Sequence, residues 1–94
     1  MVTKDKIEQI LREKINVYSI SVIDESPKHK DHAQSLKSGG GHFDLVIVSD
    51  DFEPLKLIER HRLIYGILND KFQNGIHALS VKTLTVKELS ALES

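Results

Sequence analysis

The sequence contains no cysteine. This absence excludes disulfide bonds, a thiol nucleophile and any iron–sulfur cluster held by thiolates of this chain alone. A metal centre in this protein would therefore rely on histidine rather than cysteine ligands, either in a metal binder acting alone or in a site shared with a partner.

An excess of charge of either sign is also missing. The chain has 13 lysines and arginines against 14 aspartates and glutamates, which gives a net charge of −1. Such a balance does not favour a dedicated nucleic-acid binder, which usually carries a basic excess. Only local basic patches are left for contacts with phosphate groups.

Long hydrophobic runs are absent as well, since no stretch approaches the roughly 20 apolar residues that span a bilayer. Met1 is followed almost at once by Lys4-Asp5-Lys6, without the pattern of a signal or transit peptide. We therefore expect no membrane partner and a cytoplasmic location, or an organellar one if a transit peptide has been removed.

Several functional motifs are missing too. There is no nucleophile elbow, P-loop or H-E-x-x-H pattern. Asp24 and Glu25 are adjacent, so in a strand their carboxylates point to opposite faces. No two glycines have the G-x-x-G spacing with which K-homology domains grip a nucleic-acid backbone. We expect a protein that is not an enzyme and does not bind RNA in the standard K-homology manner.

The residues that are present indicate one globular domain over residues 1–94, with 39% hydrophobic and 29% charged residues. Hydrophobic spacing predicts helices at 3–15, 54–73 and 86–92, and strands at 16–25, 42–49 and 76–84. Thr3 can cap the first helix, and Thr85 with Glu88 forms a capping box for the last one. Pro54 suits the first turn of the long helix.

The order α-β-β-α-β-α predicts an α+β two-layer sandwich, with a three-stranded mixed sheet and helices on one face. The first two strands should pair antiparallel, and the helical crossover favours a parallel third strand. Tyr18, Ile20 and Val22 are expected to share a buried face. Val46 and Val48 point away from the buried face of the second strand, which favours cover on both sides of that strand.

Four of the five histidines lie between residues 23 and 62. The predicted loop at 26–41 carries His29 and His32 beside the basic residues Lys28 and Lys30, and loops of this length are usually functional or disordered. Imidazole suits zinc, copper and iron, so histidines that converge from a loop and a strand end are candidate metal ligands. From the residues alone, the simpler alternative is that they are exposed polar side chains.

The other histidines differ in expected role. His77 begins the third strand, where a side chain can be half exposed. His42 opens the second strand, and we favour a structural or loop-tethering role for it. His61 lies on the apolar stripe of the long helix, so we expect a packed, hydrogen-bonded side chain. That stripe comprises Leu57, His61, Ile64, Tyr65, Leu68 and Phe72.

Two arginines, Arg60 and Arg62, flank His61. At about 100° per residue they project roughly 200° apart around the helix, so they cannot form one clamp. We expect one to face a partner and the other to pair with an acidic neighbour. The candidate contacts to a partner or to nucleic acid are Arg60, Arg62, Lys28, Lys30 and Lys37.

Taken together, these residues resemble the BolA family. Each motif is weak alone, but the set is specific and covers nearly the whole chain in the right order. The match rests on Asp24-Glu25-Ser26, His29, His32, His42-Phe43, Val48-Ser49, Phe52, Arg60-His61-Arg62 with Leu63 and Tyr65, and His77-Ala78-Leu79-Ser80.

The resemblance implies a K-homology class II-like fold and a partnership with monothiol glutaredoxins of the CGFS type. In such a pair a [2Fe–2S] cluster is shared with the glutaredoxin and glutathione, in iron–sulfur cluster maturation or iron regulation. Alone, the protein would hold no cofactor and would be a monomer or weak homodimer. Some bacterial members are described as DNA-binding transcriptional regulators, which is the alternative function.

The family divides by whether the loop between the first two strands offers Cys or His, and this chain resembles the His type. The resemblance makes His77 the best ligand candidate, because the family's C-terminal His falls in its H-A-L motif. Either His29 or His32 would be the loop ligand, and the sequence leaves that choice open. Two such ligands cannot complete a cluster's four positions, so the partner must supply the rest.

Overall fold

The computed structural model describes residues 2–25 and 41–93. The predicted order of helices and strands is confirmed, with the long helix divided in two and a short 3₁₀ turn added before it. The elements are α1 (Lys4–Lys14), β1 (Ser19–Asp24), β2 (His42–Val48), η2 (Asp50–Phe52), α3 (Leu57–Ile67), α4 (Asn69–Gln73), β3 (Ala78–Leu84) and α5 (Val86–Glu93).

The three strands form one mixed sheet in the order β1-β2-β3. β1 runs antiparallel to β2, with Ile20 opposite Ile47. β3 runs parallel to β2, with Val81 opposite Leu45. Both pairings agree with the prediction, and β2 is the central strand on which the other two depend.

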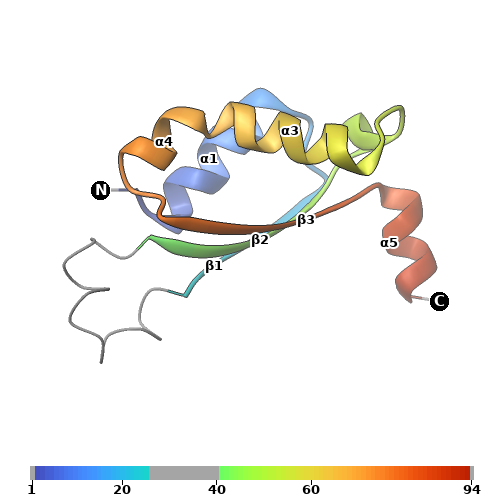
Figure 1. The fold of residues 1–94 in the computed structure, drawn as a ribbon. Helices are drawn as coiled ribbons and strands as arrows, with labels where there is room; N and C mark the ends of the chain where they lie inside the picture. Colours follow the sequence, from blue (N-terminus) through green and yellow to red (C-terminus); the bar gives the residue numbers. More distant parts are fainter. Residues whose placement is uncertain (1, 26–40, 94) are drawn as a thin grey trace.

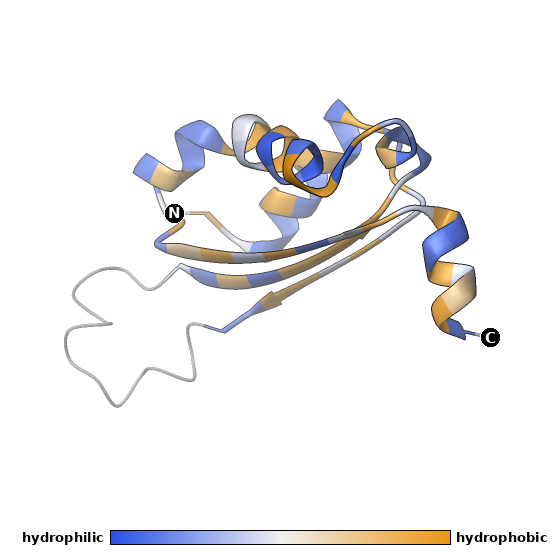
Figure 2. Ribbon diagram, turned by 45° about the vertical axis from the view of Figure 1, so that its right-hand side comes forward, coloured by the Kyte–Doolittle hydropathy of each residue, from blue (hydrophilic) through white to orange (hydrophobic). Residues whose placement is uncertain are grey.

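Helices α1, α3 and α4 cover one face of the sheet, which confirms the two-layer α+β sandwich (Figure 1). α5 instead leaves the end of β3 and lies beyond the end of the sheet (Figures 1 and 2). The core fills the space between the sheet and the covering helices. Its residues are Val2, Ile7, Leu11, Phe43, Leu45, Ile47, Phe52, Ile64, Leu68 and Ile76.

The alternation of hydrophobic and polar residues along β1, β3 and the first half of β2 explains why only one face is covered (Figure 2). Phe43, Leu45 and Ile47 are all buried, and each such side chain contributes about 1.5–3 kcal/mol when removed from water. The expectation of cover on both faces is wrong at Val46, which is 37% exposed, although Val48 is buried where the strand ends. Among the described helices, α5 alone does not pack on the opposite face, and it is short and lies past the strand ends.

Two predicted helix caps are present. The Thr3 hydroxyl accepts a hydrogen bond from the Lys6 backbone N–H at 3.2 Å. The Thr85 hydroxyl accepts from the Glu88 N–H at 3.0 Å, and the Glu88 carboxylate accepts from the Thr85 N–H at 2.8 Å. This reciprocal pair is the expected capping box.

The prediction of a single long helix at 54–73 is wrong in its start and in its continuity. Residues before α3 instead form η2, which the Ser49 hydroxyl caps and which buries Phe52 completely. Pro54 therefore lies in a turn, and α3 begins at Leu57 with the Glu59 carboxylate accepting from the Lys56 N–H at 2.8 Å. Burial of a large aromatic ring in the core outweighs the local helical preference of this segment.

The helix also breaks at Leu68, where the backbone leaves the α conformation at φ −96°, ψ 10°. The stripe continues across the break, because Ile64 and Leu68 are fully buried. Its first member does not belong to it: Leu57 is 62% exposed. Tyr18 is a similar error, since it lies before β1 and is 64% exposed rather than sharing the buried face.

Helices able to cross a membrane, judged by length and apolar character, do not occur in the described part of the chain.

Gly41 joins the start of β2 to the segment that precedes β3. Its carbonyl oxygen accepts from the backbone N–H groups of His77, at 2.8 Å, and Ala78, at 3.1 Å. Its φ of +81° lies in the region that favours glycine. A Cβ at this position would lie against the carbonyl oxygen of Gly75 and 3.0 Å from the His77 nitrogen. Glycine is therefore required for this close backbone approach.

We expect Gly41→Ala to lower the free energy of unfolding by about 2 kcal/mol, because it combines an unfavourable φ with a clash against backbone. The matched control is Gly66→Ala in α3, whose Cβ would meet nothing within 4 Å among the described residues. That variant should be more stable by about 0.5–1 kcal/mol, since alanine is the better helix former. Urea unfolding of both variants measures the difference, and a Gly41→Ala protein as stable as wild type would contradict the assignment.

Candidate functional site

Two histidines meet at the edge of the sheet where β2 and β3 both begin. His42 is the first residue of β2, and His77 directly precedes β3, whose first residue Ala78 lies opposite His42. Their ring centroids are 5.0 Å apart, with the planes inclined by 48°. His77 is exposed and His42 is half-buried. An exposed imidazole and a half-buried one thus lie side by side where the two strands begin.

This proximity follows from the parallel pairing of β2 and β3. Parallel strands begin at the same edge of a sheet, so the residues that open them become neighbours. Sequence reasoning placed His77 correctly at a strand mouth but assigned His42 to a structural role without pairing the two. The missed signal was the combination of a predicted parallel crossover with a histidine at each strand start.

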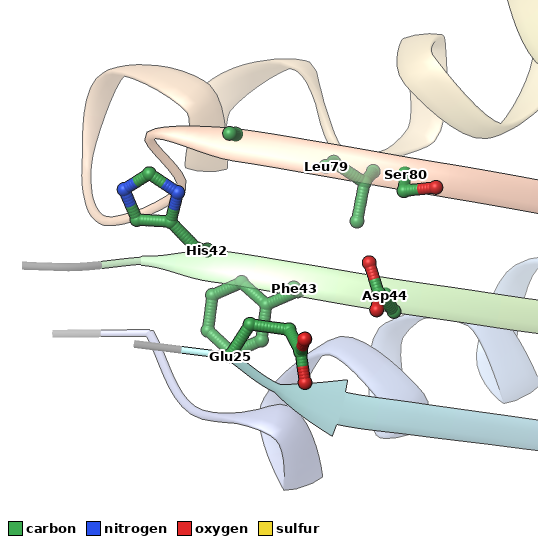
Figure 3. Close-up of a pocket in the computed structure, with 7 residues that line it drawn as sticks. Glu25, His42, Phe43, Asp44, Leu79 and Ser80 are labelled. Carbon is green, nitrogen blue, oxygen red and sulfur yellow. The ribbon is translucent and has the colours of Figure 1, made fainter. Parts of the chain in front are cut away.

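A cavity of about 320 Å³ adjoins His42 on the sheet (Figure 3). The His42 ring extends from the start of β2 toward β3, and Glu25 lies on the β1 side of the same cavity (Figure 3). The Glu25 backbone N–H donates to the His42 carbonyl oxygen at 2.7 Å. The cavity is lined by Glu25, His42, Phe43, Asp44, Ala78, Leu79 and Ser80.

The donor set at this edge fits part of a metal centre and not a whole one. Within residues 2–25 and 41–93, no group of three or more histidines and carboxylates is arranged to hold a metal ion. Two imidazole nitrogens match the iron–sulfur centres in which histidine replaces cysteine on one iron. The loop candidates His29 and His32, with Lys28, Lys30 and Lys37, lie outside the described residues.

Arg60 is engaged inside the fold, whereas Arg62 is exposed. The Arg60 Nε donates to the Leu55 carbonyl oxygen at 3.0 Å, and its terminal nitrogen donates to the Glu88 carboxylate at 2.8 Å. The expectation that one arginine pairs with an acidic neighbour is confirmed by Arg60 and Glu88, whereas the contact of the other arginine, Arg62, with a partner stays a prediction. Arg60 itself is only 9% exposed, which takes it out of the surface proposed for partner or nucleic-acid contacts.

The Arg60–Glu88 pair fastens the start of α5 to the start of α3. The Arg60 guanidinium and the Thr85 backbone N–H both hydrogen-bond the Glu88 carboxylate and hold its pKa below the ordinary value of 4.5. The guanidinium also lies 5.9 Å from the centre of the Phe52 ring. The pair is therefore part of the packing that positions η2, α3 and α5.

His61 is half-buried on α3. The hydrogen bond that we expected for its ring is not found among the residues that the structure describes. Tyr65, one turn further on, donates its hydroxyl to the Leu79 carbonyl oxygen at 2.9 Å and stacks on Phe72 at 5.3 Å. Those contacts fix α3 and α4 above β3, close to the start of the strand.

The fold, the element order and the histidine at the start of β3 together define the class of the protein. The family model for BolA-like proteins matches residues 11–88, so the chain belongs to the BolA-like family. BolA1 from Arabidopsis thaliana superposes with a TM-score of 0.80 at 30% identity, covering 94% of this chain and 96% of that one.

Two curated relatives show the range of the family. The DNA-binding transcriptional regulator BolA of Escherichia coli is 36% identical over 93 residues, which cover 99% of this chain and 85% of that protein. The SufE-like protein 1, chloroplastic/mitochondrial, of Arabidopsis thaliana is 39% identical over 88 residues, 89% of this chain. The matched region spans only 24% of that longer protein. Cytoplasmic location stays a prediction, because this relative's name places it in organelles.

The Glu88 carboxylate gives a pH-dependent prediction. Its folded pKa is lowered, so its contribution to stability is complete above its ordinary pKa and is lost as pH falls through the folded value. We expect Glu88→Gln to lower the free energy of unfolding at pH 7 by about 1 kcal/mol. The figure is modest because the Glu88 side chain is 45% exposed.

Urea unfolding at a series of pH values measures this effect. The gap between wild type and Glu88→Gln should be constant at neutral pH and shrink below pH 4.5, the ordinary pKa of the carboxyl. Glu93→Gln, on the same helix, is the control and should change stability by less than about 0.5 kcal/mol. A gap that does not depend on pH would contradict the role given to the Glu88 charge.

Proposed function

We propose that this protein is a binding and assembly protein that pairs with a monothiol CGFS glutaredoxin and shares a [2Fe–2S] cluster with it. The single observation that carries the proposal is the His42–His77 pair, which offers two imidazoles at an accessible edge of the sheet. The chain has no cysteine, so thiolates from the glutaredoxin and its glutathione would supply the remaining ligands.

His77 is the residue best suited to reach a partner's cluster. It is exposed, and its backbone N–H is fixed by the Gly41 carbonyl oxygen, so the imidazole projects from an ordered position. A second nitrogen would come from His42, which is already in contact with it, or from His29 or His32 of the loop. When bound, such a cluster supplies iron and sulfide for transfer, at a potential that nitrogen ligands raise.

A spectroscopic titration tests this proposal. Added to a cluster-loaded CGFS glutaredoxin, the wild-type protein should change the visible absorption and circular dichroism, because nitrogen replaces a sulfur ligand. We expect His77→Ala to abolish or strongly alter that change without unfolding the protein, since His77 is exposed. His61→Ala, on α3 away from the strand starts, is the matched control and should give the wild-type spectrum.

The second ligand is identified by the same titration with His42→Ala, His29→Ala and His32→Ala. The variant with the largest loss marks the ligand, while the others should retain most of the spectral change. Binding of the two proteins without a cluster need not use these side chains and should survive all four substitutions. A wild-type heterodimer spectrum from folded His77→Ala protein would sink the ligand assignment.

DNA binding is the second candidate function, favoured by the similarity to the DNA-binding transcriptional regulator BolA of Escherichia coli. In the described residues it would draw on Arg62 rather than on the buried Arg60. For this function we expect affinity for a DNA duplex to fall steeply with salt, as counterions are released from phosphate.

Arg62→Glu should weaken DNA binding and reduce the slope of log affinity against log salt by about 1 for the lost phosphate contact. The control is Arg12→Glu on α1. The Arg12 side chain is 50% exposed and pairs with Glu8. Fluorescence anisotropy at several salt concentrations measures both. Undetectable binding at low salt, or binding that salt does not affect, would exclude a direct regulator of this kind.

A further inference from the structure

A second surface lies at the other end of β3, away from the histidine pair. It is a groove of about 540 Å³ between the start of α3, the end of β3 and α5. β3 runs from Ala78 beside the histidines to Leu84 at this groove, a length of roughly 20 Å for a seven-residue strand. A ligand in the groove would therefore not compete directly for the histidine edge.

About half of the groove is lined by apolar side chains, and two of these are widely exposed to solvent. Leu57 at the start of α3 is 62% exposed, and Leu92 near the end of α5 is 64% exposed. These are two of the most exposed large hydrophobic side chains in the described part of the chain, and Leu55 and Leu84 line the space between them. Exposed apolar side chains that gather around one concave site indicate a binding surface.

The charge of the groove is positive, although the whole chain carries a net charge of −1. Three cationic side chains, Lys56, Arg60 and Lys82, line it, together with the single carboxylate of Glu88. That carboxylate is already paired with Arg60. Lys56 and Lys82 are exposed, and neither forms an ion pair with any residue that the structure describes. The groove therefore presents two free ammonium groups beside leucine side chains.

A buried hydroxyl adds a third feature. Thr83 lines the groove and is only 4% exposed. Its Oγ1 has no hydrogen-bond partner in residues 2–25 and 41–93. A buried polar atom without a partner is unfavourable, and such atoms in native proteins usually have a specific reason.

From this combination we propose that the groove binds a short segment of a partner protein in which leucine-like side chains alternate with carboxylates. The apolar side chains would pack against Leu57 and Leu92, and the carboxylates would pair with Lys56 and Lys82. The complementary charge favours this occupant over a basic or uncharged peptide. The inference does not depend on the cluster-sharing function, because the groove contains none of its candidate ligands.

The test uses the full chain labelled with ¹⁵N and three synthetic peptides, followed by NMR. The probe is acetyl-Glu-Leu-Glu-Leu-Glu-amide, and the two comparison peptides replace every Glu by Lys or every Leu by Ser. At about 1 mM we expect the probe to shift the amide signals around Leu57, Lys82 and Leu92 and to leave those of His42 and His77 unchanged. The comparison peptides should bind at least fivefold more weakly, or not at all.

Variants of groove residues, compared with variants of exposed residues elsewhere, show which side chains bind the probe peptide. Leu57→Ser should weaken the probe about tenfold, and Lys82→Glu or Lys56→Glu about fivefold, because each removes one contact of the groove. Tyr18→Ser, which alters an equally exposed apolar residue elsewhere, and Lys4→Glu on α1 should bind as wild type does. Two lysine variants at different elements keep the test valid if one of them fails to fold.

Three results would overturn the proposal: no shift with the probe, equal binding of all three peptides, or probe binding unaffected by the groove variants. Groove signals that shift with protein concentration alone would also overturn it, because they would identify the occupant as a second copy of this chain. Titration with a CGFS glutaredoxin separates the two proposals. Weakened peptide binding in Lys82→Glu with normal glutaredoxin binding is the expected result.

Discussion

The parallel pairing of β2 with β3 is the constraint on which this structure depends. It makes β2 the central strand, buries Phe43, Leu45 and Ile47 beneath the helices and brings His42 and His77 to one edge. The pairing starts at Gly41, whose carbonyl oxygen accepts two N–H groups from the segment that enters β3. Since the backbones approach too closely for any Cβ, the histidine edge and the stability of the sheet rest on the same contact.

The other end of the sheet is organised by a buried cation. Arg60 is buried on α3, where its Nε donates to the Leu55 carbonyl oxygen and one terminal nitrogen donates to the Glu88 carboxylate. Because Glu88 also completes the cap of α5, one carboxylate holds two helices in a fixed relation. The protein thus has two distinct ends, joined by β3: an edge where two histidines meet and a cationic groove lined by leucines.

The fold was largely predictable from the sequence because its signals are local. Alternation of apolar residues marked the strands, Thr3 and Thr85 marked helix starts, and the element order led to the mixed sheet.

The errors in the predicted fold and site arose where residues distant in the chain decide the structure. η2 forms because Phe52 fits the core, and no local pattern shows that. The rotation of α3 about its own axis determines that Arg60 is buried and Arg62 is exposed, although the two side chains are chemically identical. The contact of His42 with His77, which are 35 residues apart in the chain, depends on the register between β2 and β3. The loop histidines lie outside the described residues.

The position of β3 late in the chain has a consequence for synthesis. While the chain is still growing, β2 has β1 on one side and an unpaired edge on the other, since its second neighbour begins only at Ala78. Arg60 likewise emerges 28 residues ahead of Glu88, so its charge has no carboxylate to meet when α3 first forms. A nascent hairpin with an open edge and exposed Phe43, Leu45 and Ile47 is the kind of intermediate that chaperones bind. The second edge of β2 and the Arg60 guanidinium can therefore meet their native partners only after β3 and α5 have been synthesised.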